Sequence, residues 1–203
     1  FFAWRLIGKR GRNLTSEQII ERLSHKPEGG LRGDHDLNPD MLTDTGKGQD
    51  LTSAAVLIGL VDHPGGLQVL FTQRTDHLHH HPGQISFPGG HMDPGDKTPE
   101  DTALRETEEE VGLNRRHVKI IGHLNEYVTR TGFSITPVVA LVTPPFETNP
   151  DPEEVEEVFE VPLSFLLDPA NHQRHSREFE GRTREFHAMP IGDYYIWGAT
   201  AGM

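Results

Sequence analysis

One short, highly charged helix constrains the fold of this sequence more than any other feature. Thr98 can cap the helix, Pro99 suits its first turn, and Gly112 can end it in a left-handed conformation. Residues 99–111 contain six acidic residues and one arginine, a net charge of −5. This is the one strongly signalled helix within a series of strand-like segments, and that order predicts an α+β fold with a mixed sheet.

Short apolar segments bounded by turn residues supply the expected strands. Residues 54–61 and 69–71 are separated by a turn rich in glycine, which predicts a hairpin. Further strands are predicted at residues 118–121, 135–142, 184–189 and 194–197, with a closing helix after the last of them. Near the start of the chain, Thr15 and Gln18 have the spacing of a capping box and predict a helix over residues 16–25.

The composition changes sharply after this first helix. Glycine, proline, aspartate and asparagine dominate residues 26–50, which predicts a long connection that wraps around the domain. We therefore expect an N-terminal helix and extended connection over residues 1–50 and a catalytic domain over residues 51–203. A chain of 203 residues is long enough for one sizeable core.

Charge and composition exclude several classes of function. The chain has 31 acidic and 19 basic residues, a net charge of −12, which argues against a nucleic-acid partner. It has no cysteine, so disulfides, thiolate zinc sites and cysteine nucleophiles are excluded. No apolar run approaches the ~20 residues of a membrane helix, so we expect a soluble, cytoplasmic protein without a membrane partner. The oligomeric state, monomer or homodimer, stays open.

Three glutamates on the charged helix suggest a metal site. Glu106 forms like-charge pairs with Glu109 and Glu110, and each such pair costs ~0.2–0.5 kcal/mol. The same spacing places all three carboxylates on one face, where they could share the hard cations Mg²⁺ or Mn²⁺. Such a cation neutralises a diphosphate and lowers the pKa of a bound water. On the carboxylates alone, a merely solvated acidic face is an equally good interpretation.

The wider context resembles the Nudix family. Residues 105–113, Arg-Glu-Thr-Glu-Glu-Glu-Val-Gly-Leu, resemble the second half of the Nudix box, and Gly89-Gly90 lies upstream. The resemblance implies a Nudix-type α/β/α sandwich with a mixed β-sheet and a catalytic loop-helix-loop. Two positions depart from the family pattern. Thr107 replaces an aliphatic residue, and Asp96 stands nine rather than eight positions before the arginine, so Asp96 is expected to brace the turn instead of binding metal.

Residues 70–90 are similar to the coenzyme A diphosphatase branch of that family. The similar segments are Leu-Phe-Thr-Gln-Arg-Thr at 70–75, Gly-Gln-Ile-Ser-Phe-Pro-Gly-Gly at 83–90, and a late Trp-Gly-Ala-Thr-Ala at 197–201. The resemblance implies a small-molecule substrate, coenzyme A, cleaved to 4′-phosphopantetheine and adenosine 3′,5′-bisphosphate. The substrate-binding residues that it implies are Arg74, His79, His81, Gln84 and Gly89. His79 stands where the branch has arginine, and could bind a phosphate only when protonated.

The resemblance also implies roles for the helix residues. Glu106 and Glu110 are the main metal ligands, and Glu109 is a third ligand or the general base. Arg105 orients the carboxylates by ion pairing, and the carbonyl of Gly90 completes the coordination. Coupled carboxylates titrate together, so the sequence leaves open which glutamate takes the proton.

Several alternatives remain. NADH, ADP-ribose or another nucleoside diphosphate derivative is the rival substrate, and a non-hydrolytic nucleotide-binding module is the rival function. The acidic residues between Asp151 and Glu157 predict a solvated edge, from which Glu153 or Glu154 could act as a further ligand or base. A zinc or nickel site in the histidine tract 77–81 is disfavoured, because adjacent histidines in a loop cannot all point at one ion.

Overall fold

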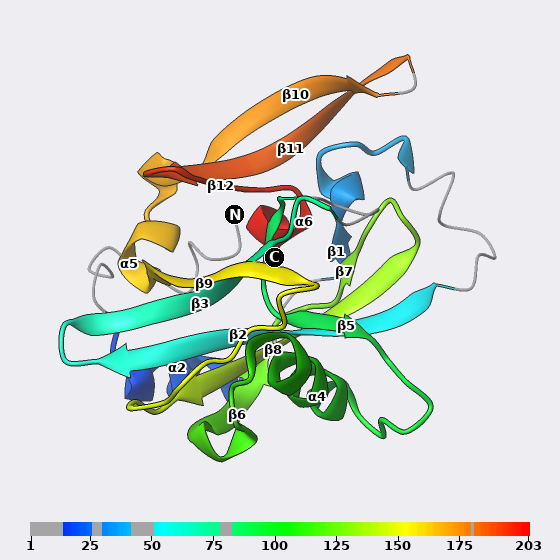
Figure 1. Cartoon of the computed structure of the whole chain (residues 1–203). Coiled ribbons are helices and arrows are strands. Elements are labelled where there is room, and N and C mark those ends of the chain that lie inside the picture. Colours follow the sequence, from blue (N-terminus) through cyan, green and yellow to red (C-terminus); the bar gives the residue numbers. More distant parts are fainter. Residues whose placement is uncertain (1–13, 26–29, 42–50, 78–82, 180) are drawn as a thin grey trace.

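A mixed β-sheet forms the centre of the molecule (Figure 1). The computed structural model describes residues 14–25, 30–41, 51–77, 83–179 and 181–203. Within these residues the main sheet has nine strands: β1 Arg32–Gly33, β2 Thr52–His63, β3 Gly66–Arg74, β4 Ile85–Ser86, β5 Gly89–His91, β6 Val118–His123, β7 Tyr127–Val128, β8 Phe133–Val142 and β9 Val155–Pro162. Their order is β1-β7-β8-β2-β3-β4, with β5 beside β2, β6 beside β8 and β9 beside β3. The pairs β1–β7 and β2–β8 are parallel and the others antiparallel.

Strand β2 is buried on both faces, which explains its nearly continuous apolar sequence. Because side chains alternate along a strand, its residues divide between two layers. Ala55 and Leu57 pack beside Ala103 of helix α4, Pro99–Val111. Ile58 and Leu60 join a larger cluster on the opposite face. One face of β2 therefore packs against helix α4, and its other face packs against the larger hydrophobic cluster.

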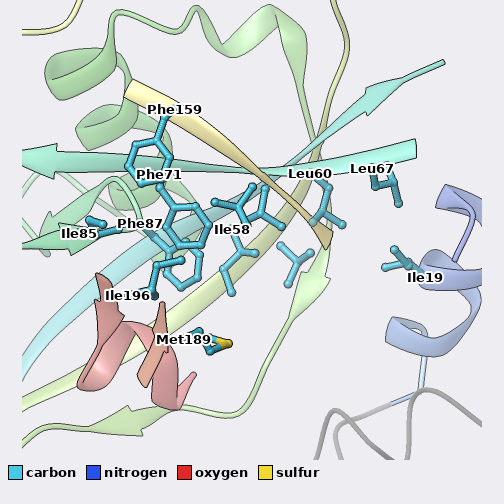
Figure 2. Close-up of a cluster of buried hydrophobic side chains, with 13 residues drawn as sticks. Ile19, Ile58, Leu60, Leu67, Phe71, Ile85, Phe87, Phe159, Met189 and Ile196 are labelled. Carbon is cyan, nitrogen blue, oxygen red and sulfur yellow. The ribbon is translucent and has the colours of Figure 1, made fainter. Parts of the chain in front are cut away.

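The opposite face of the sheet is covered by a second, three-stranded antiparallel sheet and by short helices (Figure 1). These elements are β10 Gln173–Phe179, β11 Arg182–Ile191, β12 Tyr194–Trp197, α2 Ser16–Leu23, α5 Leu163–Leu166 and α6 Ala199–Gly202. Short 3₁₀ helices span Asp34–Asp36, Arg115–His117 and Pro169–Asn171. In Figure 2, Phe71 and Phe87 lie against each other, with Ile196 of β12 beside them. The predicted α+β sandwich around a mixed sheet is confirmed, and the small sheet is an addition to it.

Several predicted elements are found where the sequence placed them. The hairpin pairs Leu60 with Val69, and helix α2 has the capping box of Thr15 with Gln18. Strand β9 was not predicted, because its charged residues obscured the alternation. Its glutamates 156 and 157 are exposed, as a solvated edge requires, while Val155, Phe159 and Val161 are buried against β3. The short strands β1, β4, β5 and β7 were also missed, since two or three residues carry no periodic signal.

Part of the N-terminal connection is tied to the domain. Asp34 accepts hydrogen bonds from the hydroxyl of Tyr127 at 2.9 Å and the backbone N–H of Arg130 at 2.8 Å. Asn38 bonds both backbone groups of Glu185, with distances of 2.9 and 3.0 Å, where the edge of β11 is free. The segment around Asp34 and Asn38 is therefore packed on the domain as part of its fold. Among the described residues, no helix is long and apolar enough to cross a membrane.

Candidate active site

Helix α4 is fixed on the sheet by small and β-branched residues. Its N-terminus is capped by Thr98, whose hydroxyl accepts from the N–H of Asp101 at 3.2 Å, and Gly112 ends it with φ of 70°. Its residues Ala103 and Val111 are fully buried on the side of the helix that faces the sheet. Thr107, the departure from an aliphatic residue, is buried too, and its hydroxyl donates to the carbonyl of Ala103 at 2.6 Å. That bond satisfies the only polar group of the side chain, so the substitution leaves the helix packed.

The backbone of β5 lies directly against two of the helix glutamates. Gly89 and Gly90 pair with Val56 and Ala55 of β2, and the N–H of Gly89 donates to the carboxylate of Glu110 at 3.0 Å. A Cβ on Gly90 would come within 2.5 Å of the carboxylate of Glu106. A side chain at Gly90 would therefore displace the carboxylate of Glu106. Sheet pairing with β2 thus places the two glycines of β5 beside helix α4.

The two glycines should respond differently to alanine. A Cβ on Gly89 would meet the backbone carbonyl of Ala55 at 2.3 Å, so Gly89→Ala must break the β2–β5 pairing and should lower the unfolding free energy by about 2–3 kcal/mol. On Gly90 the Cβ would meet only the movable end of Glu106. We expect Gly90→Ala to lose activity with little loss of stability. Urea unfolding and turnover of both variants check this, and equal destabilisation of the two would contradict it.

Arg105 is the centre of an ion-pair network. Its guanidinium donates to Asp96 at 2.9 Å, to Glu106 and Glu109 at 2.9 Å each, and to the carbonyl of His91 at 3.0 Å. The hydrogen bonds that Arg105 donates to Asp96 raise the pKa of Arg105 above its ordinary value, so its charge is permanent. Arg105 therefore forms ion pairs with two of the three helix glutamates, an arrangement compatible with the orienting role that the family resemblance implies.

Asp96 braces the turn that leads into the helix. Its carboxylate accepts from the N–H of Asp93 and the hydroxyl of Thr102, each at 3.0 Å, besides the bonds from Arg105. The hydrogen bond from Arg105 is the main reason that the pKa of Asp96 lies well below its usual range. These hydrogen bonds connect the turn to Arg105 and Thr102 and give Asp96 a bracing role despite the longer spacing before Arg105.

The carboxylates of the site carry more negative charge than their surroundings compensate. Glu110 is 6% exposed, and burial raises its pKa to about 7. The N–H of Gly89 and the charge of Arg74 oppose this rise, whereas the charges of Glu106 and Glu154 add to it. Burial likewise raises the pKa of Glu106, with Glu109 and Glu154 contributing. Two close arginines thus face four acidic groups, an imbalance typical of functional sites.

The acidic segment after β8 is attached to the end of helix α4. The N–H groups of Asn149 and Asp151 donate to the carbonyls of Val111 and Glu110, at 2.8 and 3.0 Å. These bonds satisfy carbonyls that would otherwise be free at the helix C-terminus. The carbonyl of Glu154 then accepts from the N–H of Thr75, just past the end of β3, at 3.1 Å. Of the two candidates in this acidic segment, Glu154 is the one whose charge reaches Glu106 and Glu110.

The donor set fits a hard divalent cation. Within the described residues, no three His, Asp or Glu side chains are arranged as ready metal ligands. Instead, Arg105 and the N–H of Gly89 occupy oxygens of Glu106, Glu109 and Glu110. Carboxylate oxygens are nevertheless the ligands that Mg²⁺ and Mn²⁺ prefer, and the excess negative charge around buried Glu110 is what a cation would relieve.

Most of the predicted site residues lie in one region. Arg74 ends β3, its guanidinium 3.7 Å from the carboxylate of Glu110, and its N–H donates to the carbonyl of Gln84 at 3.0 Å. The hydroxyl of Thr200 donates to the carbonyl of Ile85 at 3.1 Å, so the late Trp-Gly-Ala-Thr-Ala segment packs on the same loop. The histidines predicted to bind substrate, 79 and 81, lie outside the described residues. The sequence did not predict the contact of Asn149 and Asp151 with the C-terminus of helix α4, because backbone hydrogen bonds do not depend on side-chain type.

Comparison with known proteins places these residues in a family context. A family model described as NUDIX domain matches residues 51–180. Peroxisomal coenzyme A diphosphatase NUDT7 from Mus musculus is 38% identical over 153 residues, which cover 72% of this chain and 65% of the mouse protein. The uncharacterized Nudix hydrolase NudL from Enterobacter sp. (strain 638) is 40% identical over 152 residues, covering 74% of this chain and 78% of that protein. A crystal structure of a C. elegans Ap4A hydrolase binary complex matches 56% of this chain and 81% of its own, with 22% identity and a TM-score of 0.47.

Proposed function

This chain belongs to the Nudix hydrolase family, whose members cleave diphosphate bonds, and we propose that its substrate is coenzyme A. The observation that carries the proposal is the position of the loop that resembles the coenzyme A diphosphatase signature. Residues 83–90 contact both Arg74 and Glu110. The carbonyl of Gln84 accepts from the N–H of Arg74, and the N–H of Gly89 donates to the carboxylate of Glu110. A segment that resembles this branch therefore borders the proposed catalytic site, which supports coenzyme A as the substrate. The mouse relative named as a coenzyme A diphosphatase supports the same substrate.

We assign the metal, Mg²⁺ or Mn²⁺, to Glu106 and Glu110, with Glu109 and the carbonyl of Gly90 as further ligands. When bound, the cation would neutralise the diphosphate and lower the pKa of water, so that water can lose a proton and attack phosphorus at neutral pH. Glu154 lies close enough to influence the pKa of both main ligands, which makes it a candidate for a further ligand or base.

The protein groups around these carboxylates position the reactants. Arg74, at the end of β3, can bind two oxygens of one phosphate through its planar guanidinium. Arg105 keeps Glu106 and Glu109 in fixed orientations through its paired hydrogen bonds. Glu109 is the most exposed of the three helix glutamates, with 59% of its side chain accessible, and is our candidate for accepting the proton of water.

Product analysis tests the substrate directly. With Mg²⁺ or Mn²⁺ present, we expect coenzyme A to yield 4′-phosphopantetheine and adenosine 3′,5′-bisphosphate, and EDTA to stop the reaction. Mass spectrometry of products formed in ¹⁸O-enriched water identifies the phosphorus that is attacked. NADH and ADP-ribose serve as competitors in the same assay. If either is hydrolysed much faster than coenzyme A, the substrate proposal is wrong while the family stands.

A further inference from the structure

A cavity of about 300 Å³ lies on the face of the main sheet that is turned away from helix α4. Its floor is formed by sheet residues Ile58, Leu60, Phe71 and Val139, and Met189 of β11 contributes from the small sheet. Figure 2 shows this cluster between the strands of the main sheet, helix α2 with Ile19, and β12 with Ile196. Volumes from about 300 Å³ upward are typical of small-molecule sites. None of the helix glutamates lines the cavity, and Phe87 and Thr200 separate it from the loop that faces helix α4.

Most of the polar side chains around this apolar interior are arginine or histidine. Among the described lining residues there is no aspartate or glutamate, and five side chains are arginine or histidine: Arg22, His25, Arg32, His172 and His187. This is the reverse of the chain as a whole, in which acidic residues outnumber basic ones by 31 to 19. Arg32 already pairs with Asp36 at 2.6 Å. Burial lowers the pKa of His187, so the positive charge of the lining comes from the two arginines, and an anionic group is the complement of Arg22.

Arg22 has an unused hydrogen-bonding group. Its Nη1 is buried and has no hydrogen-bond partner in the part of the chain that the structure describes. Leaving a buried guanidinium N–H without an acceptor is costly, so an unpaired group of this kind needs an explanation. An acceptor supplied by a ligand provides one. Arg22 lies on helix α2, while the sheet residues that line the cavity are apolar. A ligand of this cavity would therefore bind Arg22 through one polar end and contact the sheet through an apolar remainder.

We infer that this cavity binds an aliphatic carboxylate, with its hydrocarbon chain against the sheet floor and its carboxylate on Arg22. A volume near the lower end of the range for ligand sites fits a chain of medium length. The inference does not rest on the proposed hydrolase activity, since different residues and the opposite face of the sheet carry it.

Calorimetric titration of the full chain with decanoate, in EDTA and without coenzyme A, tests the inference. We expect one decanoate per chain and a melting temperature that rises with its concentration. Decyltrimethylammonium, which has the same chain with a cationic head, should not bind, and decanol should bind more weakly. Absence of decanoate binding at submillimolar concentration, or equal binding of all three compounds, would overturn the inference.

Two variants separate the charged and apolar parts of the site. Arg22→Gln should weaken decanoate binding about tenfold or more and leave decanol unchanged. Arg116→Gln, an exposed arginine outside the cavity lining, is the matched control and should bind decanoate as wild type does. Leu23→Trp, which enlarges a lining side chain on helix α2, should weaken the binding of both compounds. Unchanged hydrolysis of coenzyme A by all three variants shows that they are folded, and normal decanoate binding by Arg22→Gln would disprove the site.

Discussion

Glu110→Gln should remove nearly all hydrolytic activity and make the metal-free protein more stable. The side chain is 6% exposed, and its carboxylate is one of the two proposed main ligands. Loss of a group that holds the cation on the diphosphate should lower kcat by about 10²–10⁴-fold, since such a cation contributes several kcal/mol to the transition state. Glutamine keeps the shape and can still accept from the N–H of Gly89. Steady-state kinetics and urea unfolding in EDTA measure the two effects.

The stability gain has a defined pH dependence. Because burial raises the pKa of Glu110 from 4.5 to about 7, the folded chain holds the proton more tightly than the unfolded chain. Between these two values the unfolding free energy must fall as the pH rises, and above pH 7 the full cost of the buried charge is present. Glu110→Gln removes this slope. Above pH 7 the variant should be about 3–4 kcal/mol more stable, at ~1.4 kcal/mol per pKa unit between 4.5 and about 7.

Glu108→Gln is the matched control for this prediction. It makes the same change of charge on the same helix, but Glu108 pairs with Arg115 at 2.7 Å, away from the glycine turn. Its activity should stay within a factor of about three of wild type, since an exposed ion pair contributes ~1 kcal/mol or less. Equal losses in both variants would mean that helix charge in general, and not the position of Glu110, supports catalysis.

The sequence predicted those parts of the site that depend on helical spacing. Residue types at offsets of three and four place Glu106, Glu109 and Glu110 on one face, and the cap at Thr98 fixed where the helix begins. It could not predict how deeply each carboxylate is buried. Glu109 is 59% exposed and Glu110 6%, although they are neighbours, because sheet pairing of Gly89 with β2 covers only the second. The raised pKa of Glu110 therefore follows from tertiary structure, which residue types alone do not specify.

The strands show the same division between local and non-local information. Strand β2 carries its own signal in a long apolar run, so it was found without knowledge of its partners. Strand β9 exists because β3 offers it a buried edge, against which Phe159 and Val161 pack. The burial of its apolar residues between glutamates is explained only by that partner. The acidic segment before β9 was accordingly predicted as a solvated edge, and its contact with the end of helix α4 could not be foreseen.

Arg105→Ala should reduce both stability and turnover. The substitution leaves Asp96 and Glu106, whose side chains are 7% and 18% exposed, without their charged partner. Breaking a fully buried pair costs about 3–5 kcal/mol, and because Arg105 is 23% exposed we expect a smaller loss of roughly 2–3 kcal/mol. Turnover should fall about 10–100-fold, as for other residues that orient metal ligands. Thermal unfolding and kcat at saturating substrate measure these effects.

Comparison with two milder variants shows whether Arg105 acts by position or by charge. Lysine keeps the charge but cannot donate to Asp96, Glu106 and Glu109 together, so Arg105→Lys should recover stability better than kcat. Asp96→Asn removes a carboxylate whose pKa Arg105 holds below its usual range. Such a group stabilises the folded chain above its unfolded pKa and loses this effect as the pH falls through the folded pKa. Asp96→Asn should therefore flatten the acid limb of the stability profile, and an unchanged acid limb would place the bracing role on Thr102 and Asp93 instead. If Arg105→Lys restored full turnover, charge alone would suffice and the three-carboxylate geometry would be irrelevant to catalysis.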